Sequence, residues 1–261
     1  LYKFLREMEF NRLLSSAISA YGEPELESNK IETQNLEKQQ TVNNKNYYLI
    51  NSLDEIDKWI EEAEEVGEVA VDTETTSLDP HQADLVGISL CSKIGKACYI
   101  PVGHKSPKCL KKDAVIKKLK KILEDPSIKK IGQNIKFDFI VFYKCGITLS
   151  SMEDTMLMSY VLDAGKNRHN MDTLSEIHLG HKTISFKEMV GTGKKEINFS
   201  EVELDKAKDY AAEDADVTFR LYKKFIKNLK SEKMINIYEI FEKPLIPILA
   251  FMEIEGVEID S

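Results

Sequence analysis

Long apolar segments are missing from this sequence. No apolar run approaches the roughly 18–20 residues that a helix needs to cross a bilayer, so we expect no transmembrane helix and no membrane partner. The chain also does not open with the charged and then apolar segments of a secretory signal. With 42% hydrophobic and 31% charged residues, the composition is typical of a soluble globular protein, which excludes fibrous and disordered classes.

Cysteine and arginine are scarce as well. The four cysteines, Cys91, Cys98, Cys109 and Cys145, include no Cys-x-x-Cys pair. We therefore predict reduced thiols in a cytoplasmic protein rather than disulfides or a structural zinc site. Arginine supplies only four of the 36 basic residues. Because the planar guanidinium is well suited to clamping phosphate, the isolated Arg168 is a candidate phosphate contact.

Positive charge is in short supply overall. The 36 basic residues face 44 acidic ones, which gives a net charge of −8 and a pI near 5.3. Proteins that coat nucleic acid are normally basic, so this balance argues against that class and predicts weak, salt-sensitive DNA binding. Nine lysines and three acids lie between Lys108 and Lys130, and we interpret them as a solvated helix face rather than a track for DNA.

The chain divides by composition into four parts. Residues 1–22 contain a short helix with periodic apolar positions, and we expect the tail of a preceding region there. Residues 23–46 are polar and lack aromatic side chains, so they cannot bury enough apolar surface to fold, and we predict a linker. We expect a folded domain over residues 47–230 and the truncated beginning of another over residues 231–261. Since the first residue is not methionine, we also expect a piece of a longer chain.

Hydrophobic periodicity predicts strands first and most of the helices afterwards. The expected strands cover residues 47–51, 68–74, 85–91, 97–102 and 130–133. The expected helices cover residues 52–65, 112–124, 134–144, 154–163, 171–178, 200–230 and 238–255. Ser52 and Glu55 have the spacing of a capping box at the start of the first of these helices. This order describes an α/β domain with a mixed sheet.

Two acids end the strand expected over residues 68–74. Asp72 and Glu74 are two residues apart, so on a strand their side chains point to the same face. Carboxylates at the edge of a core are costly unless a metal or another partner compensates their charge. The alternative is an exposed strand end, and acid-x-acid patterns recur elsewhere in this chain, for example at Asp214 and Asp216.

A second polar pair follows the short strand expected over residues 130–133. Asn134 and Asp138 are four residues apart and share a helix face. The local alternative makes Asn134 an N-cap and Asp138 a solvated first-turn acid that interacts with the helix dipole.

A third pair, Tyr210 and Asp214, shares a face of the long helix, and its local alternative is a partly buried tyrosine beside a surface acid. Each pair is ordinary alone, but together they supply four carboxylates. These are Asp72, Glu74, Asp138 and Asp214. Four carboxylates fit a site for two divalent cations, and hard oxygen ligands favour Mg²⁺ or Mn²⁺.

The three pairs lie within a longer pattern of five segments. The segments are Asp72-Thr-Glu-Thr-Thr-Ser-Leu-Asp79, Ile131-Gly-Gln-Asn-Ile-Lys-Phe-Asp138, Arg168-His-Asn-Met-Asp172, His181-Lys-Thr-Ile-Ser-Phe186 and Tyr210-Ala-Ala-Glu-Asp-Ala-Asp-Val217. In this order they resemble the 3′–5′ proofreading exonuclease domain of bacterial DNA polymerase I, of the DEDD type with a tyrosine. The stretch from Glu242 to Asp260 resembles the start of the polymerase domain, so we expect no polymerase activity in this chain.

The resemblance implies a ribonuclease H-like, DnaQ-like fold: a mixed sheet flanked by helices. It implies that Asp72, Glu74, Asp138 and Asp214 hold two divalent cations, Mg²⁺ or Mn²⁺, and that they and Tyr210 are catalytic in two-metal phosphodiester hydrolysis. One ion would be held by Asp72, Glu74 and Asp214, and the other by Asp72 with outer-shell help from Asp138. Because a tyrosine ordinarily has a pKa of about 10, we assign Tyr210 to orienting water rather than to general-base catalysis.

The resemblance also implies a set of DNA-contact residues. These are Thr75, Leu78, Gln133, Asn134, Arg168 and Phe186. Apolar and aromatic groups bind unpaired bases without sequence preference, which suits Leu78 and Phe186, although both would also fit a hydrophobic core. Phe137 and Thr76 depart from the family, where tyrosine and aspartate often stand, and each could alter substrate contacts.

The expected function is removal of mismatched 3′-terminal nucleotides from DNA, with release of deoxynucleoside 5′-monophosphates. The expected partners are single-stranded or frayed 3′ DNA ends and the rest of the polymerase, in a bacterial, nucleoid-associated cytoplasmic protein whose fragment is monomeric. Two alternatives remain: a ribonuclease D-like exonuclease that acts on RNA, and a non-catalytic DNA-binding or spacer module. We set aside two weaker patterns, a phosphate loop at Gly191–Lys194 that lacks its first glycine and its Ser/Thr, and a metal site at His178 and His181 that lacks a third ligand.

Overall fold

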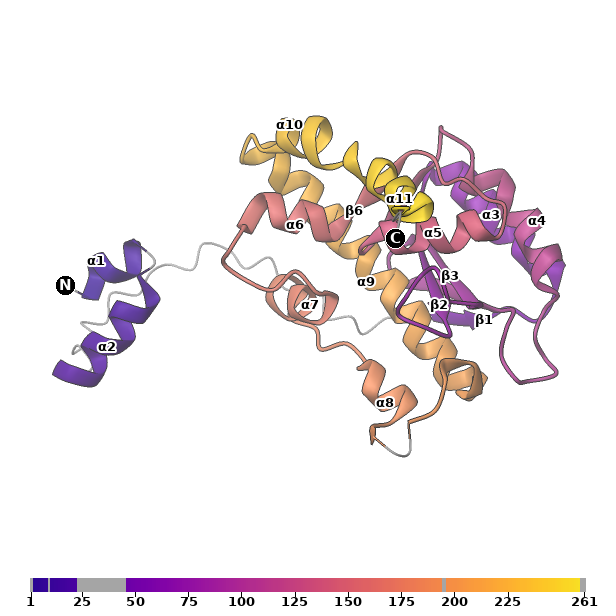
Figure 1. Ribbon diagram of the computed structural model, residues 1–261, viewed down its shortest axis with the longest axis horizontal. Helices are drawn as coiled ribbons and strands as arrows, with labels where there is room; N and C mark the ends of the chain where they lie inside the picture. The colour runs from indigo at the N-terminus through magenta and orange to yellow at the C-terminus, as the bar shows by residue number, and fades with distance from the viewer. Residues whose placement is uncertain (1, 9, 23–45, 194–195, 259–261) are drawn as a thin grey trace. The chain divides into compact units, whose positions relative to one another are not determined.

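The computed structural model describes residues 2–8, 10–22, 46–193 and 196–258 (Figure 1). The chain forms two compact units, residues 1–39 and 40–261. The predicted linker, except for Asn46, lies outside the described residues.

The first unit contains α1 (Tyr2–Glu7) and α2 (Asn11–Tyr21) in place of the single short helix that the sequence predicts. Within this unit the side chains of Leu5 and Ala17 are buried, and the Tyr2 hydroxyl donates a hydrogen bond to the carbonyl of Gly22 at 2.8 Å. Other apolar side chains of the predicted periodic face remain exposed. The two short helices therefore bury only part of the predicted apolar face.

The second unit is built on a six-stranded sheet with the order β1-β4-β3-β2-β5-β6. Its strands are β1 (Asn46–Leu49), β2 (Glu68–Thr75), β3 (Leu85–Lys93), β4 (Lys96–Pro101), β5 (Lys129–Gly132) and β6 (Met152–Asp154). β3 runs antiparallel to its neighbours β2 and β4, and the remaining pairs are parallel. The predicted mixed sheet is confirmed. The sequence pattern does not predict β6, since three residues are too few to show alternation.

Helices cover both faces of the sheet. One layer contains α3 (Leu53–Val66), α4 (Lys112–Leu123) and α5 (Ile135–Lys144). The other contains α6 (Thr155–Asp163), α7 (Met171–Leu179) and α9 (Leu204–Ser231), with α8 (Phe186–Val190) and the 3₁₀ helix η2 (Phe199–Glu201) packed beside α9. The alternation of β2 separates the two cores, because Val69 and Val71 join the α3–α5 core whereas Ala70 joins the α9 core.

The first helix layer follows directly from the sequence. In α3, Ile56, Trp59, Ile60 and Ala63 are buried at the spacing of one helix face. The predicted capping box at its start is wrong in detail, because the Ser52 hydroxyl bonds to the Glu55 carboxylate at 3.0 Å and not to a helix amide.

The lysine-rich stretch lies mainly on the outer face of α4. Lys118 pairs with Asp57 at 2.5 Å and Lys121 pairs with Glu64 at 2.6 Å, so these two lysines bind α3. Lys130, on β5, contradicts the solvated interpretation, since it is fully buried and its ammonium donates to the carbonyls of Asp125 and Ile128 at 2.6 Å each. Burial lowers the pKa of Lys130 to about 8.

The predicted long helix starts later than expected, at Leu204, because η2 precedes it. Asn198 caps η2: its side chain accepts from the amide of Ser200, while Glu201 bonds back to the amide of Asn198.

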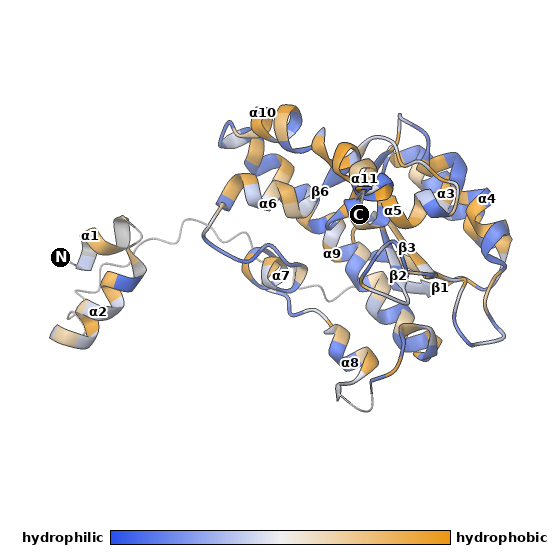
Figure 2. Ribbon diagram, viewed as in Figure 1, coloured by the Kyte–Doolittle hydropathy of each residue, from blue (hydrophilic) through white to orange (hydrophobic). Residues whose placement is uncertain are grey.

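The end of the chain is more broken than predicted. The single helix expected over residues 238–255 is wrong, because α10 (Ile235–Ile237) continues into the π-helix η3 (Tyr238–Glu242) and a separate α11 (Leu245–Glu255) follows. Pro244 stands immediately before α11, where a missing amide hydrogen costs little, and it ends the preceding turn. Figure 2 shows apolar residues along α10 and α11. Among the described residues, no helix is long and apolar enough to cross a membrane.

Candidate active site

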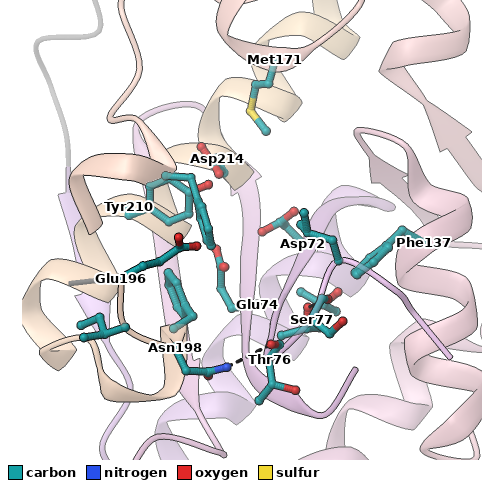
Figure 3. A pocket seen from close by; sticks show the side chains of 16 residues that line it. Asp72, Glu74, Thr76, Ser77, Phe137, Met171, Glu196, Asn198, Tyr210 and Asp214 are labelled. Atoms are coloured by element: carbon teal, nitrogen blue, oxygen red, sulfur yellow. Dashed lines mark hydrogen bonds between the residues drawn. The ribbon is translucent and has the colours of Figure 1, made fainter. Parts of the chain in front are cut away.

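Asp72 and Glu74 lie on β2, on the face that carries α9. There they meet Asp214 of α9, and carboxylate oxygens of the three residues lie within 4.8 Å of one another. Figure 3 shows these side chains directed into one cleft. Glu74 is only 6% exposed and Asp214 only 7%, so the interpretation of Asp72 and Glu74 as an exposed strand end is wrong.

The electrostatics of this carboxylate cluster are unfavourable for the chain alone. Burial raises the pKa of Asp72 to about 6. Burial also raises the pKa of Glu74 well above its ordinary value, and the charges of Asp72 and Asp214 raise it further. The pKa of Asp214 is raised by burial and then by Asp72. The charges that act most strongly on the pKa values of Glu74 and Asp214 belong to other carboxylates, so the cluster has the character of a cation site.

Asp138 reaches the same region from α5, on the other side of the sheet. Its Oδ1 accepts hydrogen bonds from the Thr73 amide at 3.0 Å and the Thr73 hydroxyl at 2.6 Å. Burial and the charge of Asp72 raise the pKa of Asp138, and the Thr73 bonds oppose that shift. Since Asp138 is 3% exposed, its interpretation as a solvated acid is wrong. Thr73 holds it beside the cluster of Asp72, Glu74 and Asp214 but outside it.

Tyr210 lies one helical turn before Asp214 and lines the same cleft. Burial raises its pKa, and the negative charges of Asp214, Glu74 and Asp72 raise it further. The phenol therefore stays protonated at neutral pH and can donate a hydrogen bond but cannot act as a base. Glu213, the neighbour of Asp214, points elsewhere and accepts from the amide of Ile184 at 2.6 Å.

Aromatic rings line the cleft beside Tyr210. The ring of Phe186 stacks on that of Phe199 with centroids 6.1 Å apart, and both rings contact Tyr210. Phe199 is buried, whereas Phe186 is 41% exposed and Leu78, which also lines the cleft, is 89% exposed. The interpretation of Leu78 and Phe186 as core residues is therefore wrong.

The cleft encloses about 530 Å³. Besides the residues already described, it is lined by side chains that the sequence reasoning does not assign to the site. These include Phe137, Met171, Glu196, Ile197, Asn198 and Phe199. Asn198 donates to the carbonyl of Thr76 at 3.0 Å, which ties the segment before α9 to the loop after β2 (Figure 3). Only the Asn198–Glu201 capping pattern could have indicated an ordered segment there.

Residues 47–230 match the family model described as a 3′–5′ exonuclease. The chain belongs to this exonuclease family. It is 43% identical over 236 residues to DNA polymerase I of Rhizobium leguminosarum and 42% identical over 212 residues to DNA polymerase I of Pseudomonas aeruginosa. These alignments cover 82% and 78% of this chain but 23% of each relative, so the chain spans about a quarter of their length.

Solved structures show the same fold for this exonuclease domain. Brucella melitensis NrnC has a TM-score of 0.63 and 23% identity over 82% of this chain and 98% of NrnC. Escherichia coli RNase D has a TM-score of 0.58 and 18% identity over 82% of this chain and 52% of RNase D. The polymerase domain structure of Pol1 from M. smegmatis has a TM-score of 0.63 and 19% identity over 82% of this chain and 33% of that one. The predicted ribonuclease H-like fold is confirmed.

Three predicted DNA-contact residues of the exonuclease domain lie outside the residues that line the cleft. Gln133 is held by hydrogen bonds, since its amide nitrogen donates to the carbonyl of His169 at 2.7 Å. Asn134 is exposed with φ of 63° and its side chain caps no helix, so its interpretation as an N-cap by side chain is wrong. Arg168 is also exposed. Thr75, Leu78 and Phe186 do line the cleft.

Two patterns that the sequence reasoning sets aside have local explanations. The His181 ring nitrogen lies 3.0 Å from the Glu213 carboxylate, and the His178 ring packs edge-on against Phe225. In the described chain, the one group of three or more potential ligands is Asp72, Glu74 and Asp214. Lys194, in the rejected phosphate-loop pattern, lies outside the described residues.

Proposed function

We propose that this exonuclease domain removes mismatched nucleotides from 3′ DNA ends by metal-dependent hydrolysis and releases deoxynucleoside 5′-monophosphates. The observation that carries the proposal is the cluster of Asp72, Glu74 and Asp214. These carboxylates meet within 4.8 Å in a cleft. Burial raises the pKa of each one, and neighbouring carboxylates raise the pKa values of Glu74 and Asp214 further. A protein keeps such an arrangement at a cost in stability, which a bound cation would offset.

The residues fit Mg²⁺ or Mn²⁺. The donors are carboxylate oxygens, which hard divalent cations prefer, and their excess negative charge suits two ions better than one. Asp72, Glu74 and Asp214 would hold the metal directly, while Asp138, fixed by Thr73, would act from beside Asp72. Bound there, the ions supply positive charge that lowers the pKa of water and stabilises a leaving oxygen.

The remaining catalytic work falls to side chains of the cleft. The protonated Tyr210 hydroxyl donates a hydrogen bond, which orients a water for attack on the terminal phosphodiester. Leu78 and Phe186 present exposed apolar surface in the cleft, where unpaired terminal bases would stack. Thr75 would lie along the strand inside the cleft, and Gln133, Asn134 and Arg168 would contact the backbone farther out.

An RNA substrate is the second candidate, because the domain shares its fold with the exoribonuclease RNase D of Escherichia coli, as it does with Brucella melitensis NrnC. Both likenesses lie below 25% identity, whereas the relatives at 42–43% identity are DNA polymerases. DNA is therefore the proposed substrate. A non-catalytic module is disfavoured by the geometry, since a spacer has no need of buried, uncompensated carboxylates.

The context of the domain follows from the same relatives. We propose that residues 47–230 work as the proofreading part of a bacterial DNA polymerase I in the cytoplasm, at the nucleoid. Residues 1–22 would end a preceding region, residues 23–46 would be a linker, and residues 231–261 would begin the polymerase domain. The piece alone would be a monomer and would bind DNA weakly. The four cysteines are free thiols, which suits a reducing compartment.

The test is nucleotide release by residues 1–261 from a primer with a 3′ mismatch, with matched RNA in a parallel reaction. We expect deoxynucleoside 5′-monophosphates with Mg²⁺ or Mn²⁺, none with a chelator, and slower release from RNA. An Asp214→Ala variant excludes a contaminating nuclease. No metal-dependent release from DNA would falsify the proposal, and faster release from RNA would favour the second candidate.

A further inference from the structure

Asp154, at the end of β6, caps two helices with one carboxylate. Its Oδ1 accepts from the amides of Met156 at 2.8 Å and Leu157 at 3.3 Å, which begin α6. The same Oδ1 accepts from the amide of Asn134 at 3.1 Å, and its Oδ2 accepts from the amide of Ile135 at 3.0 Å, which begins α5. Asp154 is 2% exposed, so water does not compete for these bonds. A buried carboxylate at two helix N-termini is a strong anchor.

The α5 end of this anchor lies one turn from the candidate active site. Asn134 has a left-handed backbone with φ of 63°, which is strained for a residue that is not glycine, and Asp138 follows four residues later. The bonds from Asn134 and Ile135 to Asp154 hold this turn in place. They therefore set the direction in which α5 presents Asp138 to Thr73 and Asp72.

The residue after Asp154 holds the neighbouring loop. The Thr155 hydroxyl contacts the carbonyl of Gly132 at 3.1 Å and the side-chain oxygen of Gln133 at 2.5 Å. Gln133 in turn donates to the carbonyl of His169. The junction of β6 and α6 thus organises the loop from β5 to α5 at two adjacent points.

Asp154 is itself held from outside the span that matches the family. Its amide donates to the Tyr238 hydroxyl at 2.9 Å, and that hydroxyl donates to the Glu153 carboxylate at 2.9 Å. Lys243 also donates to Glu153, at 2.7 Å. Tyr238 is fully buried and Glu153 is 2% exposed. Tyr238 and Lys243 follow residue 230, where the family match ends.

We propose that Asp154 is a positioning residue for Asp138, and that Tyr238 of the C-terminal segment holds Asp154 in place. The proposal rests on the proposed function for its effect on nucleotide release, but the anchoring itself is independent of that function. It predicts that the segment after residue 230 sets the geometry of the exonuclease site, so that a distortion of this segment displaces Asp138.

Asp154→Asn weakens the α5 end of the anchor. An asparagine oxygen in the position of Oδ1 still accepts from the amides of Met156, Leu157 and Asn134. Its NH₂ group then faces the amide of Ile135, which begins α5, and two donors cannot bond. We expect kcat on single-stranded DNA to fall about tenfold or more and the Mg²⁺ concentration for half-maximal rate to rise, since small displacements of catalytic groups are costly.

Tyr238→Phe removes one hydroxyl and keeps the buried ring. We expect kcat to fall about two- to fivefold and the Mg²⁺ requirement to rise, in the same direction as for Asp154→Asn. The matched control is Tyr222→Phe. Tyr222 is buried, its hydroxyl bonds to Glu68 at 3.3 Å and to Lys129 at 3.2 Å, and it repeats the Tyr–Glu–Lys chemistry away from α5. The Tyr222→Phe variant should have a lower melting temperature and an unchanged kcat and Mg²⁺ requirement.

Hydrogen exchange of the full 261-residue chain separates failure of this proposal from failure of the proposed function. The Thr73 and Ile135 amides should exchange faster in Asp154→Asn and Tyr238→Phe than in the wild type, and as slowly as wild type in Tyr222→Phe. That readout needs no activity, so an inactive wild-type protein overturns only the function. Unchanged exchange at both amides, or a lower melting temperature with unchanged kcat and Mg²⁺ requirement, would overturn the positioning role.

Discussion

Two buried aspartates on α9, Asp214 and Asp216, lie two residues apart and have opposite surroundings. Asp216 is fully buried and accepts hydrogen bonds from the side chain of Arg220 at 3.0 Å, the amide of Gly95 at 2.8 Å and the hydroxyl of Tyr47 at 3.0 Å. Asp214 faces two other carboxylates, and its pKa is raised by burial and by Asp72.

The difference separates a structural acid from a candidate functional one. The donors around Asp216 join β1, the turn between β3 and β4, and α9, so its negative charge is compensated by the fold itself. The cluster around Asp214 has a surplus of acceptors, which only a cation or protons can satisfy. Burial alone therefore does not identify a metal ligand, and the decisive property is what the fold supplies around the carboxylate.

The largest effect we expect is on activity, from Asp214→Ala. Loss of one ligand should reduce metal-dependent nucleotide release by at least about a thousandfold, because the charge that stabilises the reaction is then poorly held. The metal-free protein should keep or raise its melting temperature, since one of several repelling charges is gone. A mononucleotide release assay and thermal unfolding in a chelator measure the two outcomes, and retained activity would contradict the assignment of Asp214.

Asp216→Ala should reverse that pattern. It leaves the Arg220 side chain, which is 10% exposed, without its carboxylate and removes the acceptor for Gly95 and Tyr47, so we expect a loss of about 3–5 kcal/mol in the free energy of unfolding. The rate per folded molecule should stay near that of the wild type. Urea titration gives the stability, and the release assay at a temperature where the variant is folded gives the rate. A stable but inactive variant would show that Asp216 belongs to the active site.

The sequence predicts this contrast only in part. The mixed sheet and the ligand pairs follow from local periodicity, because strand and helix spacing place Asp72 with Glu74 and Tyr210 with Asp214. The role of Asp216 could not be predicted, since its partner Tyr47 lies 169 residues away and the tertiary fold alone brings them together.

Other parts of the site escape sequence reasoning for the same physical reason. Asp154, on the strand beside β5, acts on a helix that starts 19 residues earlier, so no local pattern shows it as the cap of α5. Phe199 contacts Phe186 and Tyr210 only because η2 folds against α9. Asn134 resembles an N-cap by its position, but the carboxylate of Asp154 supplies that function.

The dependence of stability on pH should sharpen the contrast between Asp216 and the carboxylate cluster around Asp214. The folded pKa of Asp72 is about 6, above the unfolded value near 4, so the folded chain holds a proton that the unfolded chain releases. The metal-free protein should therefore lose stability as pH rises from about 4 through 6, by about 2–4 °C in melting temperature for each kcal/mol lost.

Calorimetry between pH 4 and pH 8 measures this fall. Saturating Mg²⁺ should remove most of it, because the cation compensates the ionised cluster, and Asp214→Asn should reduce it without metal. Asp154, whose pKa burial also raises to about 6, should leave a residual fall in every sample. A metal-free fall no larger than the fall in saturating Mg²⁺ would contradict the strained state of the cluster.

Phe186, one of the aromatic rings that line the cleft, should have a smaller effect, on the binding of DNA. Phe186→Ala removes an exposed ring that a base could stack on, so KM for single-stranded DNA should rise by about tenfold, which is within the range expected from about 1–3 kcal/mol for one stacked base. Ile177→Ala is the control, since it removes a similarly exposed apolar side chain on α7 that does not line the cleft. Equal values of KM in the two variants would exclude Phe186 from the DNA path.

Tyr47 and Tyr210 provide the test with the smallest expected effects. The Tyr47 hydroxyl bonds to Asp216, and the Tyr210 hydroxyl lies beside Asp214. Tyr47→Phe removes a donor from Asp216 and should cost about 1 kcal/mol of stability with no change in kcat. Tyr210→Phe removes the hydroxyl beside Asp214 and should lower kcat about fivefold, since one hydrogen bond of about 1 kcal/mol no longer orients the water. Its stability should barely change, because the ring still contacts Phe186 and Phe199. If Tyr47→Phe lowered kcat while Tyr210→Phe lowered only stability, the division of α9 into a catalytic and a structural aspartate would be wrong.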